Sequence, residues 1–166
     1  MKISEISLVE NERILMRLCR KEDADDLKDL FDSPLTKEQT EMMINHFMLS
    51  YKEGKEANLA IVDKERDQVV GILSLYDIRQ DNSLAIGYRV KEDERNLHYA
   101  TDAVSLISPF LIENFGASVI RASAHTSNLA SVNVLTDSCY RLAAQQSGVL
   151  MFIYDNESIA RMRKVS

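Results

Sequence analysis

Hydrophobic and polar residues alternate along the chain with two different periods, which predicts short strands interspersed with helices. The segment RILMRLCR (13–20) alternates apolar and polar side chains, as a half-buried strand does. The next segment, KEDADDLKDLF, carries apolar residues on one helical face: Ala24, Leu27, Leu30 and Phe31. A Ser-Pro pair at 33–34 ends this helix, and a second helix begins at the capping box of Thr36 and Gln39.

Three β-rich runs lie between residues 57 and 90, namely ANLAIVD, QVVGILSLYDI and LAIGYRV. Short polar turns separate them, so we expect an antiparallel meander. The period then becomes helical over 97–115, where apolar residues form a stripe that ends at Gly116. Pro109 lies inside this stripe and predicts a kinked or shortened helix.

The last third of the chain returns to strands around one more helix. A strand is predicted over 117–124, and the cap cluster Thr-Ser-Asn at 126–128 precedes a short helix. CYRLAAQQ and VLMFIY are typical of a hairpin joined across 147–148, and the charged tail 155–166 is either a short helix or a frayed end. The order βααβββαβαββ predicts a mixed α/β fold with a mostly antiparallel sheet, and we expect residues 1–166 to form one domain.

Composition removes several functional classes. The 166 residues include 20 Lys+Arg and 26 Asp+Glu, a net charge of −6, and no basic stripe interleaves with aromatics. Nucleic acid is therefore disfavoured as a direct partner. No run reaches the roughly 18 apolar residues of a membrane span. The first residues lack the apolar segment of a signal peptide, so we expect a cytoplasmic protein without a membrane partner.

Cysteines and histidines give no sign of a metal or disulfide framework. Cys19 and Cys139 lie far apart and form no CxxC unit, so buried free thiols are expected. The three histidines, His46, His98 and His125, share no metal-ligand spacing. No metal site is predicted.

Candidate chemistry concentrates where the strand LAIGYRV leads through a polar turn into the 97–115 helix. Such a step aims the free amides of a helix N-terminus beyond the strand end, an arrangement that favours phosphate or pyrophosphate. Glycine would let the backbone approach the phosphates, yet the chain has none between Gly87 and Gly116. Asn96 tolerates a left-handed conformation better than most residues, and Arg95 offers a forked donor. Taken alone, the turn is better explained as a solvated charged loop that only caps the helix.

The segment IGYRVKEDERNLHYATDAV resembles the acyl-CoA-binding segment of the GCN5-related N-acetyltransferases (GNAT), whose signature is Gln/Arg-x-x-Gly-x-Gly/Ala. On this alignment Arg95 takes the first position, His98 replaces the first glycine and Ala100 takes the last position. The imidazole of His98 would therefore sit where the pyrophosphate passes, either as a donor or as an obstruction.

A second segment, NLASVNVLTDSCYRL, is similar to Asn-x-x-Ser-x-x-Val-Leu-x-x-x-Gly-Phe in the branch that includes the ribosomal-protein N-terminal acetyltransferases. Four residues match this pattern, namely Asn128, Ser131, Val134 and Leu135. Two differ, since Cys139 stands for Gly and Tyr140 stands for Phe. RILMRLCRKEDADDLKDLF resembles that branch's first strand and helix, and VVGILSLYDI its third strand. The likeness is colinear over nearly the whole chain.

The resemblance implies a GNAT-like fold, acetyl-CoA as co-substrate, and direct attack by a primary amine on the thioester. It also implies a set of coenzyme-binding residues: Tyr88, Arg89, Val90, Arg95, Asn96, Leu97, His98, Tyr99, Ala100, Thr101, Asn128 and Ser131. A backbone N–H near residues 88–90 would donate to the oxyanion. Ser131 is the candidate acid for the thiolate, although an ordinary first-turn serine is an equal alternative. Many relatives carry a glutamate where Ala85 stands, so His125 is the candidate base.

Several alternatives stay open at this stage. The acceptor is a protein N-terminus, a polyamine or another small amine. The replaced glycine and the missing glutamate also fit a family member that has lost catalysis and instead senses a ligand or binds a protein. Because each motif alone is degenerate, an unrelated α/β binding protein is a further alternative. An edge strand in the C-terminal hairpin permits a homodimer. Three methionines are assigned to core packing rather than to an acceptor pocket: Met42, Met43 and Met48.

Overall fold

An eight-stranded sheet runs through the computed structural model, which describes residues 1–165. The strands are β1 (Leu8–Glu10), β2 (Ile14–Leu18), β3 (Ala57–Asp63), β4 (Gln68–Tyr76), β5 (Leu84–Val90), β6 (Ile120–His125), β7 (Arg141–Gln146) and β8 (Val149–Tyr154). The helices are α1 (Ala24–Leu27), α2 (Lys37–Lys52), α3 (Tyr99–Phe115), α4 (Leu129–Asp137) and α5 (Asn156–Val165). The mixed α/β class is confirmed.

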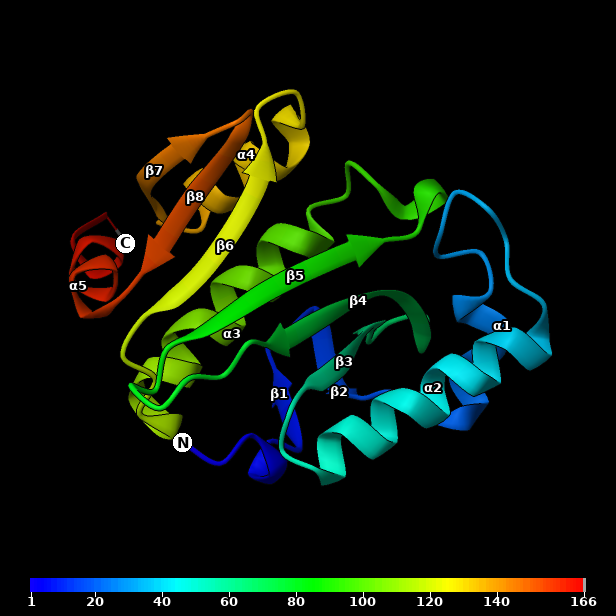
Figure 1. Ribbon diagram of the computed structural model, residues 1–166. Helices are drawn as coiled ribbons and strands as arrows, with labels where there is room; N and C mark the ends of the chain where they lie inside the picture. The colour runs from blue at the N-terminus through cyan, green and yellow to red at the C-terminus, as the bar shows by residue number, and fades with distance from the viewer. Residues whose placement is uncertain (166) are drawn as a thin grey trace.

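Within residues 1–165 the strands lie in the order β1-β2-β3-β4-β5-β6-β8-β7, and only the β5–β6 pair is parallel. The predicted meander is β3–β4–β5, and the predicted C-terminal hairpin is β7–β8. Helix α3 covers one face of the sheet, and α1 and α2 cover the other (Figure 1). In the described residues 1–165, none of the helices has the length and apolar character needed to cross a membrane.

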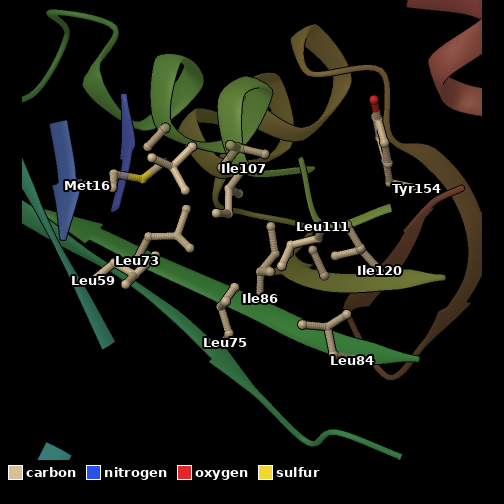
Figure 2. Close-up of a cluster of buried hydrophobic side chains, with 14 of the residues drawn as sticks. Met16, Leu59, Leu73, Leu75, Leu84, Ile86, Ile107, Leu111, Ile120 and Tyr154 are labelled. Carbon is tan, nitrogen blue, oxygen red and sulfur yellow. The ribbon is translucent and has the colours of Figure 1, made fainter. Parts of the chain in front are cut away.

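The main hydrophobic core lies between α3 and the sheet. Figure 2 shows Ile107 and Leu111 of α3 facing Leu73 and Ile86 of the sheet, and all four are buried. Burying each such side chain stabilises the fold by about 1.5–3 kcal/mol. The predicted helical stripe is therefore correct, and it fixes α3 and its N-terminus against the sheet.

Other local predictions were partly right. Gly116 ends α3 in a left-handed conformation, as expected for a helix C-terminus, but Pro109 does not shorten the helix, which continues to Phe115. The predicted first helix is only one α-helical turn after a 3-10 turn. Met42 and Met48 were assigned to the core, which is wrong: they are 67% and 42% exposed, because Ile44 is the buried apolar anchor of α2.

The position that matters most for function is the gap between β5 and β6. These strands pair only at Leu84–Ile120 and Ala85–Arg121, and then they diverge (Figure 1). Because the Lys91 N–H donates to the Val70 carbonyl on β4 at 2.8 Å, alternation along the strand turns the amides of Tyr88 and Val90 toward the gap.

Close approach of β4 and β5 holds the end of β5 in place. A Cβ on Gly71 would lie 2.4 Å from the carbonyl oxygen of Arg89, so only glycine allows this spacing. The strand end that carries Arg89 is thereby fixed beside the gap.

Candidate active site

A cavity of about 590 Å³ opens where β5 ends and where α3 and α4 begin. Most of the predicted coenzyme residues line it: Tyr88, Arg89, Val90, Arg95, Asn96, His98, Tyr99, Ala100, Thr101, Asn128 and Ser131. Three separate parts of the sequence thus meet at one concave surface, the kind of place where small ligands bind.

The turn before α3 is left-handed at two residues although it has no glycine. Asn96 has φ 63° and His98 has φ 65°. The first helical hydrogen bond runs from the Asp102 N–H to the His98 carbonyl at 2.9 Å, so the amides of Ala100 and Thr101 precede the bonded ladder and lie at the cavity. Amides at a helix N-terminus carry partial positive charge and suit an anion.

Two arginines add full positive charge to the cavity mouth. Arg89 Nη1 and Arg95 Nη2 lie 3.7 Å and 3.9 Å from Oδ1 of Asp32. Asp32 belongs to the α1–α2 connection, where the ring of Phe31 also lies 5.2 Å from the Arg89 guanidinium. Sequence reasoning missed Asp32 and placed Phe31 with the helix core, since neither residue carries a local signal for contact with β5.

A hydroxyl pair lies on the α4 side of the cavity. The Tyr88 and Ser131 side-chain oxygens are 2.9 Å apart, and the Asn128 side chain caps α4 by accepting from the Ser131 N–H at 3.1 Å. Burial raises the pKa of Tyr88, while its hydrogen bond with Ser131 acts in the opposite direction. The phenol therefore keeps its proton near neutral pH and can supply it to Ser131.

Helix α4 contributes more cavity residues than the motif predicted. They recur at helical spacing on one face: Ala130, Asn133, Val134 and Asp137. The i, i+3, i+4, i+7 pattern was visible in the sequence. Val134 is a position of the motif, whereas Ala130, Asn133 and Asp137 lie between or beyond its matched residues.

Two predicted residues lie elsewhere. Leu97 is exposed and lines a second cavity, of about 700 Å³, on the other side of the turn. His125 lies at the exposed end of β6, with its Nδ1 2.7 Å from the Ser127 hydroxyl oxygen. It is not among the residues that line the first cavity, which contains Ser131 and is called the Ser131 cavity below. The structure therefore brings the candidate acid, but not the candidate base, to the β5–β6 gap.

Comparison with known proteins agrees with this architecture. The family model of the acetyltransferase (GNAT) domain matches residues 13–138. No curated protein sequence matches the chain.

Solved structures share the fold at low sequence identity. Apo FdhC, a nucleotide-linked sugar GNAT, has a TM-score of 0.82 at 13% identity, over 96% of this chain and 97% of that chain. The ribosomal-protein-S5-alanine acetyltransferase from Vibrio fischeri has a TM-score of 0.75 at 16% identity, over 92% and 98%. RimL, a ribosomal L7/L12 alpha-N-protein acetyltransferase in complex with coenzyme A, has a TM-score of 0.74 at 15% identity, over 92% and 99%.

These neighbours include ribosomal-protein acetyltransferases, as the resemblance in sequence implied. The structural likeness shows the common fold, and the family model spans well over half of the chain. The protein therefore belongs to the GNAT family of acetyltransferases.

Proposed function

We propose that the protein transfers the acetyl group of acetyl-CoA to a primary amine, either a protein N-terminus or a small amine. The observation that carries this proposal is the cavity at the β5–β6 gap, which joins helix-terminal amides, two arginines and a serine–tyrosine pair. RimL binds coenzyme A, and the microcin C7 self-immunity acetyltransferase MccE binds acetyl-CoA and AMP, which supports the choice of coenzyme.

The coenzyme diphosphate would lie at the start of α3. The amides of Ala100 and Thr101 would donate to its oxygens, and Arg95, with a planar fork of donors, would neutralise its charge. The diphosphate would compete with the Asp32 carboxylate for these arginines, because Oδ1 of Asp32 lies 3.7 Å from Arg89 Nη1 and 3.9 Å from Arg95 Nη2.

The acetyl thioester would lie in the gap itself. The amine lone pair attacks the carbonyl carbon, and a backbone N–H of Tyr88 or Val90 donates to the oxyanion. As the tetrahedral intermediate collapses, the C–S bond breaks and Ser131 protonates the thiolate, with Tyr88 returning a proton to Ser131 and regaining one from solvent. We propose His125 as the acceptor of the amine proton, through water, since its ring does not line the cavity.

A ligand-binding and turnover experiment tests this proposal. Coenzyme A or acetyl-CoA at about 100 times its dissociation constant should stabilise the fold by about 2.7 kcal/mol. Turnover is then measured with peptides that have a free N-terminus, with polyamines, and with N-acetylated peptides as the matched control. Release of free thiol with free amines alone supports the proposal, and absence of any stabilisation by either coenzyme would refute it.

A second candidate is a catalytically lapsed member that binds coenzyme without transfer. Two observations favour it: Ala85 is buried at the position where many relatives carry glutamate, and His125 does not line the cavity. Stabilisation by acetyl-CoA without thiol release over the whole amine panel would select this alternative.

We also propose that two copies of the chain associate through β7. This strand forms the edge of the sheet, and its residue Leu142 is 56% exposed. An uncovered edge is a template for pairing with another strand. Light scattering of the wild type and of Leu142→Lys would show a dimer that the charge disrupts; a monomeric wild type would refute the pairing.

A further inference from the structure

The turn before α3 must be held from outside, because its own residues do not favour its shape. Residues other than glycine pay a conformational penalty in the left-handed region, and both Asn96 and His98 adopt it. His98 is the N-cap residue of α3, yet its side chain makes no capping hydrogen bond. Something more distant has to keep the backbone in this conformation.

Arg66, in the β3–β4 turn, contacts the chain on both sides of the two left-handed residues. Its Nη1 and Nη2 donate to the two carboxylate oxygens of Glu94 at 2.9 Å and 2.7 Å. Its Nη2 also donates to the Tyr99 hydroxyl at 3.1 Å. Glu94 precedes the turn and Tyr99 follows it, so one guanidinium closes the segment between them.

The partners of Arg66 are themselves buried and joined. Tyr99, Glu94 and Asp63 are 4%, 7% and 8% exposed, and the Tyr99 hydroxyl donates to Oδ2 of Asp63. This hydrogen bond, together with those from Arg66, lowers the pKa of Asp63 to about 2, and the hydrogen bonds from Arg66 lower the pKa of Glu94. Both carboxylates are therefore ionised at neutral pH, where they hold the guanidinium most strongly.

Arg13, next to β2, contacts the same turn. Its Nη2 donates to the Leu97 carbonyl at 2.5 Å, between the two left-handed residues, and its Nη1 donates to Asp102 at 2.8 Å. Its guanidinium also lies 4.2 Å from the centre of the Tyr99 ring. The two arginines thus fix the ends and the middle of the turn.

We propose that Arg66 is a positioning residue for the coenzyme: with Arg13, it holds the glycine-free turn so that the amides of Ala100 and Thr101 face the diphosphate. Arg66 lines the second cavity and not the Ser131 cavity, so it acts through the turn and not by touching the ligand. This inference rests on the proposed binding of coenzyme A.

The test compares Arg66→Met with Lys64→Met. Lys64 lies in the same β3–β4 turn and pairs with Glu10, so its removal changes the net charge equally without touching the α3 turn. If loss of the clamp leaves the binding-competent turn about one-tenth populated, the dissociation constant for coenzyme A rises about tenfold. We expect this rise for Arg66→Met in titration calorimetry, and a change below about twofold for Lys64→Met by the same relation.

Amide hydrogen exchange of the protein without coenzyme A distinguishes a positioning role of Arg66 from an effect of its charge on the ligand. Arg66→Met should speed exchange at 95–102 while the strands of the core stay protected, whereas Lys64→Met should leave both unchanged. This measurement needs no ligand, so it still tests the clamp if the wild type does not bind coenzyme A and the proposed function fails. Unchanged exchange at 95–102, or an equal loss of affinity in both variants, would overturn the inference.

Two further variants guard against misfolding of Arg66→Met. Arg66→Lys keeps the charge but loses the two-pronged contact, so we expect an intermediate loss of affinity. Adding His98→Gly to Arg66→Lys relaxes one left-handed position, and it should recover most of that loss if the clamp holds the turn. Equal loss from Arg66→Lys with and without His98→Gly would contradict the proposed role.

Discussion

Helices α3 and α4 begin at the same cavity, but their N-termini are held in different ways. The start of α4 is held locally, because the Asn128 side chain accepts from the Ser131 N–H, three residues away. The start of α3 is held by arginines that lie 28 residues from Glu94 and 84 residues from Leu97. A local cap can be read from a sequence, whereas a tertiary clamp becomes visible only when the chain is folded.

Removing the Ser131 hydroxyl should have the largest effect, since it takes away the proposed acid of the α4 terminus. We expect Ser131→Ala to lower kcat about a hundredfold, with the KM for acetyl-CoA changed less than about threefold. Steady-state kinetics with Thr136→Ala as the control measures this, because Thr136 lies on the same helix but outside the cavity. A kcat equal to that of the wild type would show that Ser131 is only a first-turn polar residue.

The Tyr99→Phe variant removes one hydrogen bond from the clamp of α3. Because the bond is to a charged carboxylate, we expect a loss of about 1.5–3 kcal/mol of unfolding free energy at pH 7. Tyr76→Phe, on an exposed tyrosine, is the control.

The same clamp has a defined pH dependence. Asp63 has its pKa lowered from 3.8 to about 2, so it adds stability above the unfolded value, near pH 4, and loses it as the pH falls toward 2. Denaturation curves between pH 7 and pH 2 should therefore show the Tyr99→Phe deficit shrinking below pH 4. A deficit that stays constant down to pH 2 would mean that Asp63 is not the partner that matters.

Loss of the local cap should have a smaller effect. Asn128→Ala is expected to lower the unfolding free energy by about 1 kcal/mol. This corresponds to a fall in Tm of about 2–4 °C for a chain of this size. Asn128→Ser keeps a capping oxygen and should stay close to the wild type in a thermal melt. An equal fall for both variants would argue against capping as the cause.

The smallest effect is expected at Asp32, on the loop that reaches across to the α3 side. Its exposed ion pairs with Arg89 and Arg95 are worth about 0–1 kcal/mol, so Asp32→Asn should tighten coenzyme A binding by no more than about fivefold. Asp29→Asn is the matched control from the same loop. Weaker binding of coenzyme A by Asp32→Asn would show that the carboxylate does not compete with phosphate.

The fold could be predicted largely from the sequence because its signals are local. The β3–β5 meander follows from alternating residues and short turns, and the buried face of α3 follows from its helical stripe. The strand β1 was missed because a segment of three residues is too short to show an alternating apolar and polar pattern. The helix at α1 was predicted, but as too long, and Phe31 was wrongly placed on its buried face, because an apolar pattern does not reveal which side chains find partners.

The candidate site likewise has one part that local sequence signals predict and another part that they do not. Residues at or beside the two motifs, such as Arg95, Ala100 and Ser131, could be placed from the sequence, and they do line one cavity. Asp32 and the Arg66 clamp could not be found, because their roles depend on contacts between distant segments. His125 could be named as a candidate from its chemistry and its place at a strand end, but only the structure shows that it does not line the cavity with Ser131.

The most direct test of this account is a crystal structure of the protein with coenzyme A. We predict that the diphosphate accepts hydrogen bonds from the Ala100 and Thr101 amides, that Asn96 and His98 stay left-handed, and that the thiol lies in the β5–β6 gap near Ser131. A coenzyme bound elsewhere, or a turn that unwinds at His98 to admit the phosphates, would contradict it.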